Sequence, residues 1–286
     1  MKKYLSLVTF AHTIFALPFA LLAAVLAARG MPALPVLFWI LVAMVGARSA
    51  AMAFNRIADR DVDAVNPRTK TRDIPAGRVS VAAASVFCAL SASVFVLAAW
   101  RLNPLCLALS PVALLVVLGY SYTKRVTTLS HLVLGLGLAI APVGAWIAVT
   151  GAFALLPVVL GLSVLFWVAG FDVIYSLQDE AFDREHGLFS IPARQGARRA
   201  LAISTAFHAV SLTLLYLALV LASGGLLFGL GVVLAGVFLV RQHVLVRPGD
   251  LSRVDGAFSP RTAGFRWPSS SAGRPTSSSA GSLADR

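Results

Sequence analysis

Long apolar segments with almost no charge recur along most of the chain, and short polar loops separate them. Several of these segments exceed about 18 residues, which is long enough for a helix to cross a bilayer. Because a backbone in lipid must satisfy its own hydrogen bonds, we predict an all-α, polytopic transmembrane helix bundle of about eight spans. The predicted spans are residues 10–28, 34–54, 81–100, 104–119, 130–149, 153–176, 200–222 and 224–240.

Composition and charge support this interpretation. Apolar residues make up 58% of the sequence, above the roughly 45–50% of soluble domains. Lys and Arg gather in the loops after the second, fourth, sixth and eighth spans, whereas the opposite loops hold only Arg29 and Arg101. This asymmetry predicts that the N-terminus and the long loops are cytoplasmic. In a soluble protein, a net charge of +12 would suggest a nucleic-acid partner. Here the positive residues lie in alternate loops, so we expect the lipid bilayer as a partner and no nucleic acid.

Acidic residues are few, and most of them lie in two clusters. The first cluster is Asp59, Asp61, Asp63 and Asp73, and the second is Asp172, Asp179, Glu180, Asp183 and Glu185. Both clusters fall at the predicted cytoplasmic ends of spans. Carboxylates at the edge of the hydrocarbon are costly, so their presence there indicates a functional site.

The spacing within each cluster is helical. Asn55, Asp59 and Asp63 are four residues apart, so they share one face if the second span continues as a helix. The second set follows a spacing of three, four and four, and it is Asp172, Tyr175, Asp179 and Asp183. Two such faces at the same membrane depth can converge and offer oxygen ligands to Mg²⁺, which also binds substrate phosphate. The spacing therefore predicts an active site at the cytoplasmic side.

Basic residues accompany the acids. Those of interest are Arg56, Arg68, Arg72, Lys124 and Arg125. The preference of cytoplasmic loops for Lys and Arg explains any one of them without a ligand. Their coincidence with acids that need a metal favours a second role, which is to neutralise the charge of a diphosphate.

These motifs resemble the UbiA superfamily of intramembrane aromatic prenyltransferases over most of the chain. The residues that carry the resemblance are NxxxDxxxD at 55–63, an Arg-Asp-Ile-Pro-Ala-Gly run at 72–77, YxxxKR at 120–125, DxxYxxxDxxxD at 172–183, and Gly-Leu-Phe-Ser-Ile-Pro at 187–192. Residues 6–20 look like the branch of 4-hydroxybenzoate polyprenyltransferases. The family usually has nine spans.

The resemblance implies roles for individual residues. Asn55, Asp59 and Asp63 would hold one Mg²⁺, and Asp179 and Asp183 a second. The diphosphate would be bound by Lys124 and by some of Arg56, Arg68, Arg72 and Arg125. Asp172 and Tyr175 would act in catalysis by orienting the acceptor or the intermediate.

The resemblance also implies an activity. It is the Mg²⁺-dependent transfer of a polyprenyl group from its diphosphate to an aromatic acceptor such as 4-hydroxybenzoate, in ubiquinone or menaquinone biosynthesis. The expected location is the bacterial inner (cytoplasmic) membrane.

Several alternatives stay open. The shared motifs bind the diphosphate, so the acceptor could also be a naphthoate, haem, chlorophyllide or a glycerol phosphate lipid. A cation transporter with paired intramembrane carboxylates is the alternative from another class. The compact DGxxAR motif of CDP-alcohol phosphotransferases is not found.

The composition changes near the C-terminus. We assign residues 1–258 to the prenyltransferase-like membrane domain. Residues 259–286 are rich in Ser, Gly, Arg and Pro, so we predict a disordered tail. We interpret it as a truncated or frame-shifted end that lacks the ninth helix, or as the tail of a true short variant.

Overall fold

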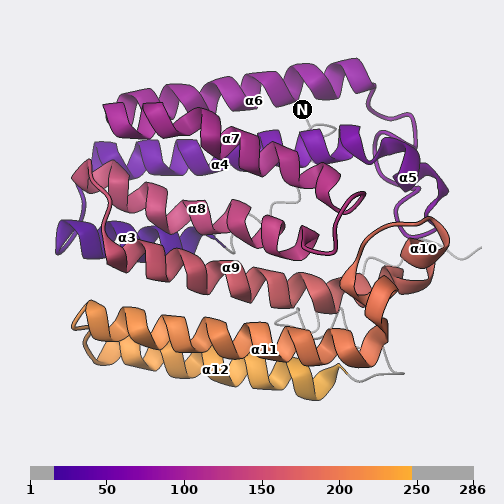
Figure 1. The fold of residues 1–286 in the computed structure, drawn as a ribbon. Coiled ribbons are helices and arrows are strands. Elements are labelled where there is room, and N and C mark those ends of the chain that lie inside the picture. The colour runs from indigo at the N-terminus through magenta and orange to yellow at the C-terminus, as the bar shows by residue number, and fades with distance from the viewer. Residues whose placement is uncertain (1–15, 247–286) are drawn as a thin grey trace, which may run out of the picture.

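The computed structural model describes residues 16–246, and over this range it consists of helices and loops without strands. The long helices lie side by side (Figure 1). They are α3 (Leu17–Ala28), α4 (Leu34–Ala58), α6 (Val81–Leu102), α7 (Pro104–Thr123), α8 (Ser130–Thr150), α9 (Leu155–Ser176), α11 (Ile191–Leu221) and α12 (Leu226–Leu245). The short elements are α5 (Arg60–Val65), a 3₁₀ turn η1 (Leu177–Asp179) and α10 (Glu180–Glu185).

The predicted all-α membrane bundle is confirmed. Seven helices in the described range are long and apolar enough to cross a membrane. The first predicted span, 10–28, begins outside the described residues, and its described part is the twelve-residue α3. The predicted tail at 259–286 also lies outside them.

The seventh span differs most from its prediction. We expected residues 200–222, but α11 begins at Ile191. Hydropathy missed its first turns because Arg194, Arg198 and Arg199 lie there. Gly196 interrupts these turns with φ 78° and ψ 162°, a left-handed backbone that favours glycine. The turn before Gly196 is therefore set off from the rest of α11 by a kink, and its residues Ile191, Pro192 and Ala193 are buried.

Close helix contacts position the cavity walls. A β-carbon at Gly46 of α4 would lie 2.9 Å from the backbone nitrogen of Phe95 in α6. A β-carbon at Gly135 of α8 would overlap the carbonyl oxygen of Leu165 in α9. Small residues allow helices in lipid to approach closely and gain van der Waals contact. These pairs therefore set how far apart the helices around the site stand.

We expect Gly135→Ala to destabilise the α8–α9 pair, because the added methyl group has no space. The cost of overpacking is about 1–3 kcal/mol. The matched control is Gly137→Ala on the same helix, where a β-carbon would lie 3.8 Å from Val117 Cγ1, an ordinary contact. Thermal unfolding in detergent should show a lower Tm for the first variant only, and equal Tm values would contradict this packing argument.

Candidate active site

The first acidic motif crosses a helix break. Helix α4 ends at Ala58, and Asp59 leaves the helical conformation with φ −91° and ψ 3° before α5 starts. The condition that the second span continues as one helix through the motif is therefore not met. The hydrogen bonds nevertheless continue across the break, from Asp59 N–H to Asn55 O at 2.9 Å and from Asp63 N–H to Asp59 O at 2.7 Å. The four-residue spacing thus still brings the three side chains to one cavity.

The second motif is broken in a similar way. Asp172 and Tyr175 belong to α9, which ends at Ser176, whereas Asp179 closes the 3₁₀ turn and Asp183 lies in α10. The helical course of the motif thus continues as three consecutive elements, and α9 ends at Ser176, where the predicted span also ended. The change of direction carries α10 to the end of the bundle where α5 also lies (Figure 1). The two acidic motifs therefore meet across the same opening.

A polar cavity of about 480 Å³ joins the two motifs. Every residue that we predicted for the site lines it except Arg125. The cavity also contains polar residues that the sequence analysis did not select, and these include Arg48, Asn66, Tyr120, His131 and Ser190. The structure thus brings the predicted residues together, and their roles stay predictions.

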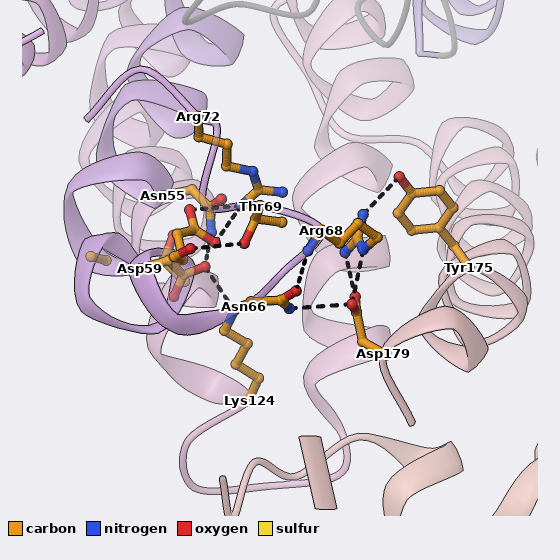
Figure 2. A network of polar contacts seen from close by, with 12 residues as sticks. Asn55, Asp59, Asn66, Arg68, Thr69, Arg72, Lys124, Tyr175 and Asp179 are labelled. Carbon is orange, nitrogen blue, oxygen red and sulfur yellow. Dashed lines mark hydrogen bonds and ion pairs between the residues drawn. The ribbon is translucent and has the colours of Figure 1, made fainter. Parts of the chain in front are cut away.

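Asp59 is the most enclosed of the acids, with 2% of its surface exposed. Lys124 Nζ lies 2.8 Å and Asn55 Nδ2 3.0 Å from its Oδ2 atom. Figure 2 shows Asp59 between these two side chains. Arg125 approaches the other oxygen at 3.4 Å and donates to the carbonyl of Ala58, which explains its position behind the cavity wall.

Asp63 is almost as buried, at 3% exposure. Both of its carboxylate oxygens accept from Arg72 Nη1, at 2.6 and 2.7 Å. Charge-assisted pairs of this kind are among the stronger hydrogen bonds in proteins. This pair holds the loop that follows α5 against the first acidic motif.

Asp179 is bound by a residue of the other motif's loop. Arg68 donates from Nε to Oδ1 at 2.8 Å and from Nη2 to Oδ2, and Asn66 Nδ2 lies 3.3 Å from Oδ1. Arg68 Nη1 also donates to the hydroxyl of Tyr175 at 3.2 Å (Figure 2). Partial burial lowers the pKa of Arg68, but the hydrogen bond and charge of Asp179 outweigh this effect and leave the pKa raised. Arg68 therefore links the two acidic clusters.

The donor atoms suit a hard cation, although their present partners are cationic side chains. Carboxylate and amide oxygens are the ligands that Mg²⁺ prefers. Among residues 16–246, however, no three His, Cys, Asp or Glu side chains stand close enough together to hold a metal ion. Asp59, Asp63 and Asp179 are instead paired with Lys124, Arg72 and Arg68. Metal binding thus requires these cations to change partners.

An apolar cavity of about 420 Å³ adjoins the polar one. Arg48, Tyr120, Leu134 and Leu138 line both, so the two cavities meet there. The Nε atom of Arg48 is buried and has no hydrogen-bond partner in the described part of the chain. The signal for Arg48 was present in the sequence, since a charged residue within a predicted span indicates function.

Comparison with known proteins agrees with this geometry. Residues 16–267 match the UbiA prenyltransferase family. The chain is 30% identical over 239 residues to a 4-hydroxybenzoate octaprenyltransferase of Francisella tularensis subsp. novicida, covering 84% of both proteins. It is 32% identical over 227 residues to the enzyme of the same name from Shewanella frigidimarina, covering 79% of both.

Solved structures show the same fold. A UbiA homologue from Aeropyrum pernix K1, without bound ligand, matches with a TM-score of 0.80 at 37% identity and covers 87% of this chain and 92% of its own. A homologue from Archaeoglobus fulgidus bound to GPP and Mg²⁺ matches with a TM-score of 0.69 at 19% identity, covering 89% and 95%.

We expect Arg68→Met to loosen both loops that Arg68 joins. Loss of the partly exposed ion pair between Arg68 and Asp179 costs roughly 1 kcal/mol. This corresponds to about a fivefold rise in the equilibrium constant for local opening of the two loops. Hydrogen exchange followed by mass spectrometry should show faster exchange in residues 66–78 and also in 177–185. The control is Arg78→Met, because Arg78 pairs with Asp73 within its own loop. Unchanged exchange at 177–185 in Arg68→Met would disprove the link.

Proposed function

We propose that this chain, which belongs to the UbiA prenyltransferase family and is a multi-pass membrane prenyltransferase, transfers a polyprenyl group to a carboxylated aromatic acceptor. The acceptor that we propose is 4-hydroxybenzoate, in ubiquinone or menaquinone biosynthesis. The observation that carries this proposal is the junction of a polar, carboxylate-rich cavity with an apolar one at Arg48, whose buried Nε atom has no hydrogen-bond partner among residues 16–246.

The polar cavity suits the diphosphate. We assign Asn55, Asp59 and Asp63 to one Mg²⁺ and Asp179 and Asp183 to a second. The homologue of the same fold that is bound to GPP and Mg²⁺ supports a site for a metal and a prenyl diphosphate. Bound Mg²⁺ would supply positive charge to the diphosphate as it departs.

The cations of the site would then exchange partners. Lys124, Arg68 and Arg72, which now pair with carboxylates, lie in the same cavity and would bind oxygens of the diphosphate. Arg56 lines the cavity from α4, and Arg125 would support Asp59 from behind. Such preorganised charge stabilises a leaving group without the reorganisation that water requires.

The apolar cavity suits the isoprenoid tail. Its lining includes Met44, Phe95, Leu109, Phe153 and Leu165. These walls exclude water, which would otherwise capture the reactive cation. The bond between the allylic carbon and the diphosphate oxygen breaks with its electron pair on oxygen. A ring carbon ortho to the phenol then attacks the allylic carbon, and a base takes the proton that this ring carbon loses.

Arg48 would bind the carboxylate of the acceptor. Its planar guanidinium can hold a carboxylate through two parallel hydrogen bonds. Asp172 and Tyr175 line the polar cavity together with Arg48, and we assign them to orienting the phenol end. The relatives named 4-hydroxybenzoate octaprenyltransferase support this choice of acceptor over haem or a glycerol phosphate lipid.

We also propose that the acidic motifs face the cytoplasm from the inner membrane. The basic residues Arg60, Arg78 and Arg184 lie in the segments at that end of the bundle. Their enrichment there follows the preference of cytoplasmic loops for positive charge.

We expect Asp59→Asn and Asp179→Asn to lose at least about 100-fold in kcat/KM, because each removes a carboxylate from the diphosphate site. The assay follows transfer of labelled geranyl diphosphate to 4-hydroxybenzoate in membranes, with and without Mg²⁺. Asp61→Asn is the matched control, since Asp61 is 80% exposed and contacts only Arg60 among the ion pairs of the described chain. Activity that survives Asp59→Asn, or that needs no Mg²⁺, would contradict the assignment.

We expect Arg48→Met to raise KM for 4-hydroxybenzoate by roughly 10- to 100-fold, the range for a lost hydrogen bond to a charged group. The neutral analogue 4-hydroxybenzamide tests the cause, because its KM should change little. Arg101→Met, which removes a cation stacked on Trp39, is the control for general effects of losing an arginine. Equal effects on both acceptors would exclude Arg48 as the carboxylate site.

A further inference from the structure

His131 makes two hydrogen bonds that join three helices beside the polar cavity. It lies in the first turn of α8, and 2% of its surface is exposed. Its Nδ1 atom stands 2.7 Å from Oδ2 of Asp172 in α9. Its Nε2 atom accepts the backbone N–H of Ile191, the first residue of α11, at 3.2 Å.

These contacts determine which ring nitrogen carries the hydrogen. A backbone N–H can only donate, so Nε2 must present a lone pair to Ile191. The hydrogen of the ring is therefore on Nδ1, where it is donated to Asp172.

The N–H of Ile191 needs such an acceptor. The first N–H groups of a helix have no partner within the helix. The Ser190 hydroxyl accepts from Ala193 and the Ser190 carbonyl from Arg194, whereas Pro192 has no N–H to donate. The imidazole thus satisfies a buried backbone donor and orients itself by the same contact.

Asp172 is held at one oxygen only. Its Oδ2 atom is taken by His131, and Oδ1 makes no hydrogen bond to any other described residue. The side chain lines the polar cavity and is 28% exposed. A carboxylate fixed at one oxygen cannot rotate freely, so Oδ1 is presented to the cavity in a constant direction.

We propose that His131 is a positioning residue that acts through Asp172, holding its carboxylate toward the phenol end of the aromatic acceptor. The inference rests on the proposed function, because it needs Asp172 to orient the acceptor. The order of contacts is backbone N–H of Ile191, imidazole of His131, then carboxylate of Asp172. The backbone at the start of α11 therefore sets the direction of the Asp172 carboxylate in the polar cavity.

Two substitutions separate this role from a purely structural one. In His131→Gln, the amide oxygen can replace Nε2 as the acceptor for Ile191, while the donor to Asp172 is lost. In His131→Asn, the amide nitrogen lies where Nδ1 was, so the donor is retained and the acceptor is lost. Kinetics with a prenyl diphosphate and 4-hydroxybenzoate, and thermal unfolding of the full chain in detergent, would be measured for both.

The expected result is a crossed pattern. His131→Gln should keep its Tm and lose about 10- to 100-fold in kcat, which is the size of effect that a misplaced reacting group produces. His131→Asn should lower the Tm but retain at least several times more kcat than His131→Gln. KM for the prenyl diphosphate should stay unchanged in both, since neither contacts the cations of the site. Loss of kcat that simply follows loss of Tm would overturn the proposal.

A spectroscopic measurement tests the contact without turnover. ¹⁵N spectra of histidine-labelled protein distinguish a hydrogen on Nδ1 from one on Nε2, and comparison with His131→Gln identifies the signal. A hydrogen on Nδ1 supports the proposal, whereas one on Nε2 or on both nitrogens overturns it. If the wild-type chain prenylates no aromatic acid, the proposed function fails, and the spectrum still decides whether His131 holds Asp172.

Discussion

The structure of the site depends on the neutralisation of carboxylates at the edge of an apolar bundle. Asp59 and Asp63 are nearly inaccessible to solvent, and a buried charge without a partner costs several kcal/mol. Lys124, directly after α7, and Arg72, in the loop after α5, meet this requirement. Arg68 does the same for Asp179 across the opening. The ion pairs thus position the two loops and the end of α7 around the cavity.

The same pairs prepare the cavity for the proposed chemistry. A metal-bound diphosphate brings both positive and negative charge, so carboxylates and cations can exchange partners without leaving either unpaired. The apolar cavity adjoins the polar cavity that contains these ion pairs, and Arg48 lines both. This separation of polar and apolar regions suits the two ends of the proposed substrate. Its tail would lie among the helices, and its charged head would lie among the loops.

The local predictions failed at particular residues for physical reasons. Helix α4 ends at Ala58 and α9 ends at Ser176, yet the backbone hydrogen bonds through Asp59 preserve the spacing of the first motif. The start of α11 was missed because Gly196 and neighbouring arginines interrupt the apolar pattern. His131 was missed because one histidine at the start of a span carries no signal until its partners are known.

Hydropathy alone determined the class of the chain, because helices in lipid must satisfy their own backbone and this demands long apolar segments. Spacing also selected the candidate acids of the site, since residues three and four apart share a helical face. The candidate cations were selected because basic segments accompany these acids in the sequence. Only the tertiary structure decided the pairings. Asp59 meets Lys124 across 65 residues of sequence, and Arg68 meets Asp179 across 111. Such contacts follow from how helices pack at small residues, which a periodic pattern along one helix does not specify.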